Sequence, residues 1–192
     1  KSTLLQDVII CSESSTVLDA GSGFDSYLWS NGATTSTSGN LTVGEYYVDL
    51  GYNGCVYRQS VKINAAPTIN IQNVDVNGST ITVNVSGGTA PYQYSLDGIA
   101  WQDSNIFTNI SRGVRKVYVK DSYNCAVVER DFLIVNLINV ITPNGDGYND
   151  AMDYSDLRIK KDVSIQIFDR YGKAVYNAVT TNYKWDGIYL GR

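Results

Sequence analysis

Residues 112–121 have the sequence Arg-Gly-Val-Arg-Lys-Val-Tyr-Val-Lys-Asp, a glycine-led stretch in which polar and apolar side chains alternate from Lys116 to Lys120. A period of two predicts a half-buried β-strand, because successive side chains of a strand point to opposite faces. The same pattern, bounded by turn-forming residues, predicts strands at 68–76, 80–86, 92–96 and 127–135, with a weaker one at 105–110. No stretch has a sustained helical period, so we expect an all-β fold.

The composition agrees with this fold class and excludes several functions. The 192 residues include 15 Tyr and 17 Gly, and 43% are hydrophobic, which is enough for packed cores. The sequence has no His, which rules out a Ser-His-Asp triad, a Cys-His dyad and a His-ligated metal site. We therefore expect no enzymatic activity. The net charge is -4 and no basic stripe exists, so we expect no nucleic-acid partner. The longest apolar run, 132–141, is too short for a transmembrane segment.

Two segments share one order of features, which indicates tandem modules. Each has a glycine-rich turn, an aromatic strand that ends in a glycine turn, a glycine-led strand, and a turn containing Asn and Cys. These features lie at 18–24, 26–32, 43–49 and 53–55 in the first segment, and at 85–90, 91–98, 112–121 and 124–125 in the second. Short strands between regular turns predict immunoglobulin-like β-sandwiches.

A third pattern occupies the last quarter of the chain. It consists of Ile141-Thr-Pro-Asn-Gly-Asp-Gly-Tyr-Asn-Asp150, Val163-Ser-Ile-Gln-Ile-Phe-Asp-Arg-Tyr-Gly-Lys-Ala-Val-Tyr176 and Trp185-Asp-Gly187. Strands are predicted at 163–168 and 173–176, joined by a turn in which Gly172 supplies the positive φ that a hairpin needs.

Short linkers at Pro67 and at 136–139 separate these segments. The fold predicted from sequence is therefore a tandem of immunoglobulin-like β-sandwich modules, with a first module at 1–65, a second module at 66–136 and a C-terminal module at 137–192.

The three cysteines allow a predicted pairing. Cys11 and Cys55 bracket the first module around Trp29, in the manner of an immunoglobulin cystine around a core Trp. We expect them to form a disulfide at one end of the sandwich, the alternative being two small buried thiols. Cys125 has no partner in its own module, so we expect it to be buried and free.

The glycine-interrupted loop at 144–150 carries four side chains with oxygen donors, namely Asn144, Asp146, Asn149 and Asp150. Hard cations such as Ca²⁺ take oxygen ligands of this kind, so one interpretation is a calcium site. The other is a turn in which Asn and Asp side chains bond backbone amides, with no cofactor. The sequence leaves both open.

Parts of the chain resemble known families. The first module, with Leu-Asp-Ala-Gly at 18–21 and Tyr-Leu-Trp-Ser-Asn-Gly-Ala-Thr-Thr at 27–35, resembles PKD-like or Ig-like repeats of Bacteroidota surface proteins. The second module, with Gly-Gly-Thr-Ala-Pro-Tyr-Gln-Tyr-Ser at 87–95, resembles the SprB-type repeat. Such repeats serve mainly as spacers or adhesive modules.

The C-terminal module resembles the type B sorting domain of the type IX secretion system, also called the gliding-motility-associated C-terminal domain. The residues that carry the resemblance are Pro143, Asn144, Gly145, Asp146, Gly147, Asp169, Tyr171, Gly172, Trp185, Asp186 and Gly187. The family's pattern continues past Trp-Asp-Gly with a Pro/Gly turn and a Tyr-rich strand, whereas this sequence ends at Arg192. We therefore expect the sorting domain to be truncated at its C-terminal end.

The resemblance implies that the chain is the C-terminal region of an adhesin-like or gliding-motility protein. Such a protein is exported through the periplasm and outer membrane to the cell surface or the medium. Its partners would be outer-membrane components of type IX secretion, namely a translocon, a shuttle protein and a sortase-type protease. A surface glycan is a further candidate partner, with Trp29 and Trp101 as a sugar-binding platform or, alternatively, as core residues. The competing hypothesis is a carbohydrate-binding accessory region of a larger secreted enzyme.

Overall fold

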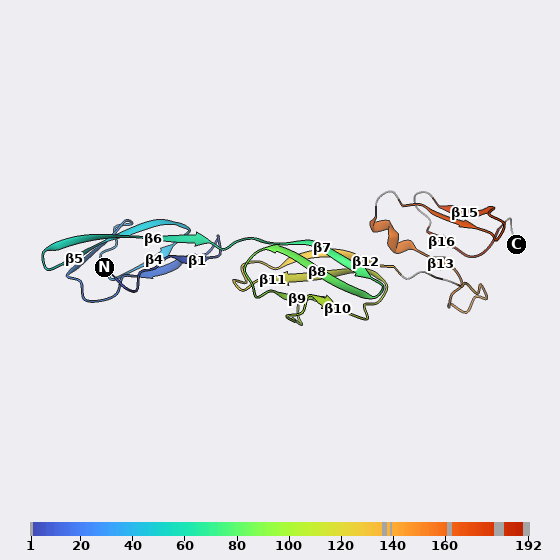
Figure 1. The fold of residues 1–192 in the computed structure, drawn as a ribbon, viewed down its shortest axis with the longest axis horizontal. Coiled ribbons are helices and arrows are strands. Elements are labelled where there is room, and N and C mark those ends of the chain that lie inside the picture. Colours follow the sequence, from blue (N-terminus) through green and yellow to red (C-terminus); the bar gives the residue numbers. More distant parts are fainter. Residues whose placement is uncertain (1, 136–137, 139, 161–162, 179–182, 190–192) are drawn as a thin grey trace. The chain divides into compact units, whose positions relative to one another are not determined.

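The computed structural model describes residues 2–135, 138, 140–160, 163–178 and 183–189. In the first module, one sheet has the order β1-β6-β5-β3 and a second sheet pairs β2 with β4 (Figure 1). The strands are β1 (Val8–Ile10), β2 (Thr16–Asp19), β3 (Ser26–Trp29), β4 (Thr37–Leu41), β5 (Gly44–Tyr52) and β6 (Cys55–Ala65).

A single apolar core lies between these two sheets. It takes its side chains from both, including Leu18 and Leu41 from the small sheet and Trp29, Leu50 and Ile63 from the large one. Trp29 is only 2% exposed, and its indole N–H donates to the backbone oxygen of Thr35 at 2.9 Å. Both sheets thus bury the apolar face that alternation predicts, and the module is a β-sandwich.

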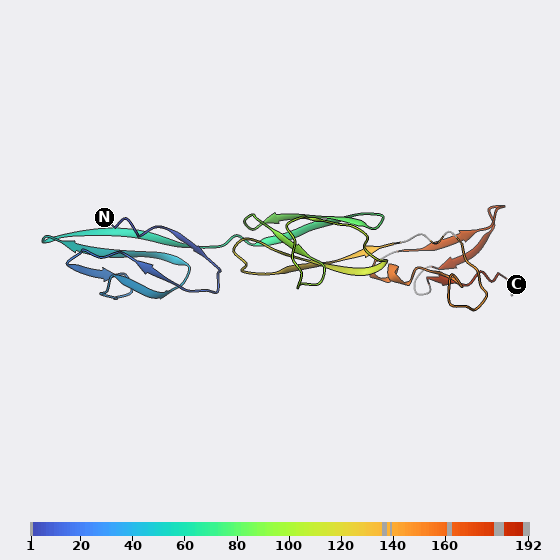
Figure 2. The same ribbon diagram turned by 90° about the horizontal axis from the view of Figure 1, so that it is seen from below.

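The second module has two three-stranded sheets, β10-β8-β7 and β12-β11-β9, which Figure 2 shows in green to yellow. The predicted strands are confirmed to within two or three residues. They are β7 (Ile69–Asn77), β8 (Thr80–Gly87), β9 (Gln93–Ser95), β10 (Ile106–Phe107), β11 (Gly113–Lys120) and β12 (Val128–Ile134).

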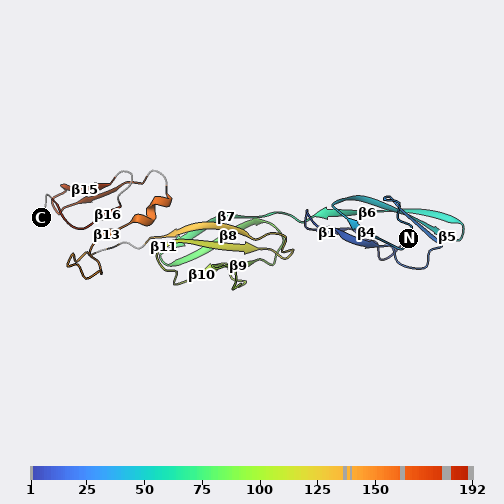
Figure 3. The same ribbon diagram turned by 180° about the vertical axis from the view of Figure 1, so that it is seen from behind.

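The C-terminal module contains two two-stranded sheets, β13-β16 and β14-β15 (Figure 3). Its elements are β13 (Met152–Asp153), a 3-10 helix η1 (Ser155–Ile159), β14 (Ile165–Phe168), β15 (Ala174–Ala178) and β16 (Lys184–Trp185). The chain is therefore all-β with immunoglobulin-like modules, as predicted. Across the described ranges, no helical element has the length and apolar character that crossing a membrane requires.

Every strand pairing in the described residues joins strands of one predicted module. Backbone contacts nevertheless divide the chain into two compact units: residues 1–70 with 86–92 and 120–127, and residues 71–85 with 93–119 and 128–192. The boundaries at 65 and 136 stay a prediction, and part of the linker at 136–139 lies outside the described residues, as does Arg192.

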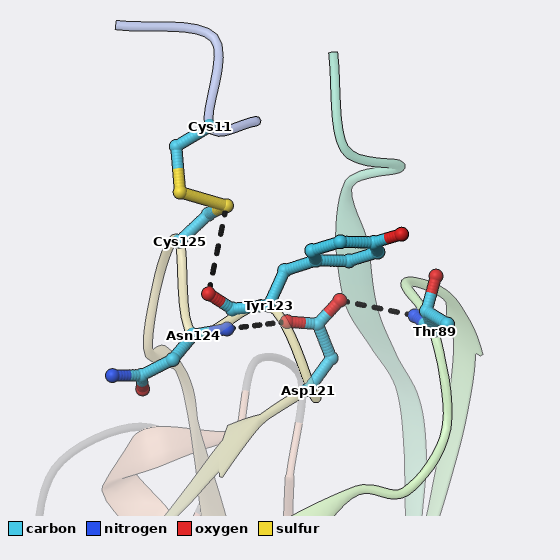
Figure 4. Close-up of a disulfide and its surroundings, with 6 residues drawn as sticks. All are labelled: Cys11, Thr89, Asp121, Tyr123, Asn124 and Cys125. Atoms are coloured by element: carbon cyan, nitrogen blue, oxygen red, sulfur yellow. Dashed lines mark hydrogen bonds between the residues drawn. A yellow bond between two sulfur atoms is a disulfide. The ribbon is translucent and has the colours of Figure 1, made fainter. Parts of the chain in front are cut away.

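The predicted cysteine pairing is wrong. Cys11 bonds to Cys125, with a Cα–Cα distance of 5.3 Å (Figure 4). Cys55 is the free cysteine and is exposed. The turn that carries Cys125 is held by the buried carboxylate of Asp121, which accepts the backbone N–H groups of Thr89 at 3.0 Å and Asn124 at 3.1 Å.

Strand register explains why Cys11 and Cys55 do not pair. β1 runs parallel to the end of β6, with Ile10 opposite Ala65. Cys11, the next residue after Ile10, therefore lies beside the C-terminal end of β6. Cys55 is the first residue of that 11-residue strand. At about 3.3 Å per residue, the two ends of β6 lie about 33 Å apart. A disulfide requires Cα atoms within about 7 Å.

Thiol counting checks this pairing. Alkylation of the denatured, non-reduced chain should add one adduct to the natural sequence, none to Cys55→Ser and two to Cys125→Ser, as measured by intact mass. A Cys11–Cys55 bridge would instead give two adducts on Cys55→Ser and none on Cys125→Ser.

Candidate functional site

The structure brings the first and third motifs of the C-terminal module together. β13 follows directly after the loop of the first motif and pairs antiparallel with β16, placing Met152 opposite Trp185 and Asp153 opposite Lys184. Sequence analysis did not predict these two strands, because two residues are too few to show a period.

The Trp-Asp-Gly turn lies against the start of the first motif. Gly187 has a φ of +87°, and a Cβ at this position would be 2.9 Å from the Ile141 side chain and 3.4 Å from that of Pro143. Asp186 accepts the backbone N–H of Ile188 at 3.0 Å, which shapes the turn. Both the backbone conformation and the close packing therefore require glycine.

The loop at 144–150 is organised around the carboxylate of Asp150. One oxygen accepts the N–H groups of Asn144 at 3.0 Å and Gly145 at 2.8 Å, and the other accepts that of Gly147 at 2.8 Å. Asp146 accepts the N–H of Tyr148 at 2.8 Å. The amides of Gly145 and Gly147, followed by that of Asn144, hold the pKa of Asp150 below its usual value, because they stabilise the charged carboxylate.

These contacts match the second interpretation of the loop, a turn in which Asn and Asp side chains bond backbone amides. Asn144 accepts the N–H of Asp146 at 3.1 Å, and the backbone oxygen of Asn149 accepts the N–H of Thr142 at 2.7 Å. The carboxylate oxygens of Asp146 and Asp150 thus accept backbone N–H groups, as the turn interpretation predicts. Within the described ranges, no group of three or more His, Cys, Asp or Glu could hold a metal ion. Calcium binding stays a prediction.

The β14–β15 hairpin contains the second motif. The side chain of Asp169 accepts the N–H groups of Tyr171 at 2.8 Å and Lys173 at 2.9 Å, and Gly172 has the predicted positive φ of 81°. Ile165 and Ile167 are half-buried on one face of β14, whereas Gln166 is exposed. The predicted alternation of this strand is therefore confirmed.

Tyr176 connects this hairpin to the third motif. Its hydroxyl donates to the backbone oxygen of Lys184 at 3.0 Å, and its ring centroid lies 6.1 Å from that of Trp185. Trp185 is half-buried and donates its indole N–H to the backbone oxygen of Ile188 at 3.1 Å. It therefore contributes to the small core without filling it.

Two tyrosines that sequence analysis did not single out also hold this module. Tyr183 is 5% exposed, and its hydroxyl donates to the oxygen of Val163 at 3.4 Å. The hydroxyl of Tyr154 accepts the N–H of Ile138 at 2.9 Å. The high Tyr content was the available signal, but composition does not say which tyrosines are structural.

The proposed aromatic platform for sugars is not formed by Trp29, which is buried in the core of the first module. Trp101 is half-buried. The core alternative is thus correct for Trp29, and glycan binding stays an untested hypothesis for the rest of the chain.

Gly187→Ala tests the packing of the third motif on the first. We expect a loss of about 2 kcal/mol or more in the free energy of unfolding, from the positive φ and from the contact with Ile141. Gly145→Ala is the matched control, because Gly145 has a φ of +78° with nothing near its Cβ position. Denaturant unfolding should show a larger loss for Gly187→Ala; equal losses would contradict the packing.

Acid should open the 144–150 loop. Since the pKa of Asp150 is lowered by folding, its stabilising effect is complete above its unfolded value of about 3.9 and is lost as the pH falls through the lower folded value. NMR shifts of the Gly145 and Gly147 amides should follow this titration. In the Asp150→Asn variant, residue 150 has no titratable group, so these amides should not titrate. A similar titration in this variant would contradict the assignment of the titration to Asp150.

Comparison with solved structures finds immunoglobulin-type proteins of low similarity. Drosophila OTK extracellular domains 3–5 are 10% identical with a TM-score of 0.28, over 69% of this chain and 58% of that one. An amphioxus IgVJ-C2 molecule is 14% identical with a TM-score of 0.30, over 67% of this chain and 99% of that one. No curated protein matches the chain. These likenesses carry no information on function.

Family models match two segments. Residues 74–100 match the SprB repeat, and residues 135–191 match the CHU_C type IX secretion signal domain. The second match covers the three motifs that the structure assembles around β13–β16 and the β14–β15 hairpin. The chain therefore carries a type IX secretion signal domain preceded by a SprB repeat, and it is a region of a protein exported across the outer membrane to the cell surface or the medium.

Proposed function

We propose that residues 137–192 act as a folded export signal that type IX secretion recognises by shape, through strand edges and exposed apolar side chains. The modules before it serve as non-enzymatic spacers or adhesive units. The observation that carries this proposal is the assembly of all three motifs of the matched family in one small module.

Charge offers little basis for recognition. The sequence after Asn136 contains as many Lys and Arg as Asp and Glu, so this module has no net charge to steer a partner. The absence of His from the sequence supports a non-enzymatic role.

Exposed apolar side chains and unpaired strand edges give a partner more to recognise than charge does. Phe168 is 55% exposed and Tyr171 is 83% exposed, and both lie at the turn of the β14–β15 hairpin. Within the described residues, this sheet has two strands, so each has an edge that no third strand pairs with. Such an edge accepts a strand from a partner through backbone hydrogen bonds. We propose that a translocon or shuttle component makes this contact, and that a sortase-type protease acts after export.

Export of the parent polypeptide in a type IX-secreting host tests the proposal. Ile165→Asp places a charge on the half-buried face of β14 and should trap the protein in the periplasm, because the signal no longer folds. Gln166→Asp, one residue along on the exposed face, is the matched control and should be exported normally. Immunoblotting of periplasmic, surface and medium fractions measures both.

A double variant, Phe168→Asp with Tyr171→Asp, tests the displayed surface without touching the buried face. We expect export to fall at least several-fold while the module remains protease-resistant. Normal export of this variant would overturn recognition through the hairpin, and normal export of Ile165→Asp would overturn recognition of a folded signal.

A further inference from the structure

We propose that the Cys11–Cys125 disulfide acts as a mechanical bypass, which carries tension along the chain past the first and second modules and keeps both folded until a thiol cleaves the bond. The covalent route itself does not depend on export. Its use under load rests on the proposed function, in which these modules are spacers or adhesive units at the cell surface and a bound target would pull on them.

The disulfide shortens the covalent route through the chain. Its two cysteines are 114 residues apart in sequence, and their Cα atoms are 5.3 Å apart. Every strand from β2 to β11 lies between them in sequence. Tension applied before Cys11 and after Cys125 therefore passes through the two bonded sulfur atoms, and residues 12–124 form a closed loop outside this route.

This closed loop contains most of the two apolar cores. In the first module, the buried Trp29 and Leu50 belong to it. In the second module, the fully buried Ile81 and Val117 belong to it. The side chains that stabilise the two sandwiches are therefore attached mainly to backbone that the tension bypasses.

The strands that remain on the loaded route are already extended. β1 ends at Ile10, next to Cys11, and β12 begins at Val128, shortly after Cys125. Both are edge strands of the described sheets, whose orders are β1-β6-β5-β3 and β12-β11-β9. A β-strand rises about 3.3 Å per residue, which is close to the limit of an extended chain. Tension can therefore pass along β1 and β12 without lengthening them or detaching them from the next strand.

Both cysteines are anchored in folded backbone. Beside Cys11, the backbone oxygen of Ile10 accepts the N–H of Ala66 at 2.8 Å. On the other side of the bond, the buried carboxylate of Asp121 accepts two backbone N–H groups and so holds the turn that carries Cys125 (Figure 4). The disulfide thus joins two segments that are each fixed within their own module.

A small thiol can reach and cleave this bond. Cys125 is exposed and Cys11 is half-buried. A thiolate attacks the sulfur of Cys125 and forms a mixed disulfide, and the sulfur of Cys11 leaves as a thiolate that takes up a proton. A second thiol then displaces Cys125, so two small thiols are oxidised to one disulfide and two protein thiols form. Cleavage transfers the load to residues 12–124, which makes the bypass a redox-sensitive switch.

Single-molecule stretching of the full chain, held through peptide tags at residues 1 and 192, tests the bypass. Every chain carries Cys55→Ser, so that no third thiol can exchange with the bond. At about 3.4 Å per residue, the oxidised chain should reach a fully stretched length of about 270 Å, and the matched Cys125→Ser chain about 650 Å. An oxidised chain as long as the Cys125→Ser chain would overturn the proposal.

Cleavage under constant force distinguishes protection of the modules from simple cross-linking. The force is chosen so that the sandwiches of the Cys125→Ser chain take seconds to unfold, or those of Cys11→Ser if the first variant does not fold. Reduced glutathione is added after the C-terminal module of the oxidised chain has unfolded. Folded sandwiches should give a short step at cleavage and separate later steps, which together add about 380 Å. A single step of that size at cleavage would overturn the proposal, because the sandwiches would already have been unfolded.

The same experiment tests release by thiols. Glutathione should cleave the stretched bond within the time that it needs to reduce the denatured chain, and survival of the bond beyond that time would overturn the switch. These measurements involve no secretion, so a failure of the bypass and a failure of the proposed export function are separate results.

Discussion

Each long strand of this chain must bury one face, and this constraint determines which residues meet at the ends of the modules. In the first module, Val48 and Leu50 of β5 share a core with Trp29 and Ile63. That packing fixes the register of β5 with β6 and so places Cys55 at the hairpin tip. The chemistry of the chain is therefore found in its turns, where glycines, asparagines and cysteines lie.

The sequence correctly predicted the strands in which apolar and polar side chains alternate. The strands of the second module and the half-buried face of β14 follow directly from apolar residues at every second position. Sequence failed where the outcome depends on contacts between distant segments. The pairing of Cys11 with Cys125 depends on which module ends meet, and spacing within one module cannot show this. The two-residue strands β13 and β16 were missed because they are too short to alternate.

The C-terminal module obtains its shape from local bonds more than from a large core. Asp150 and Asp169 each hold a turn by accepting backbone N–H groups, and Gly187 allows the Trp-Asp-Gly turn to contact Ile141. Asp169 and Gly187 are among the residues that carry the resemblance to the secretion signal family, and Asp150 is the last residue of its first motif. Their role in this structure is to build turns, which agrees with a signal that is recognised by its fold.

Hydrogen–deuterium exchange of the intact chain, with and without solubilised outer membranes from a type IX-secreting cell, most directly tests recognition of the folded signal. The account predicts slower exchange of backbone amides in β14 and β15, whose outer edges would pair with the partner, and unchanged exchange in β5 and β6. Protection confined to the first module, or none in residues 163–178, would contradict it.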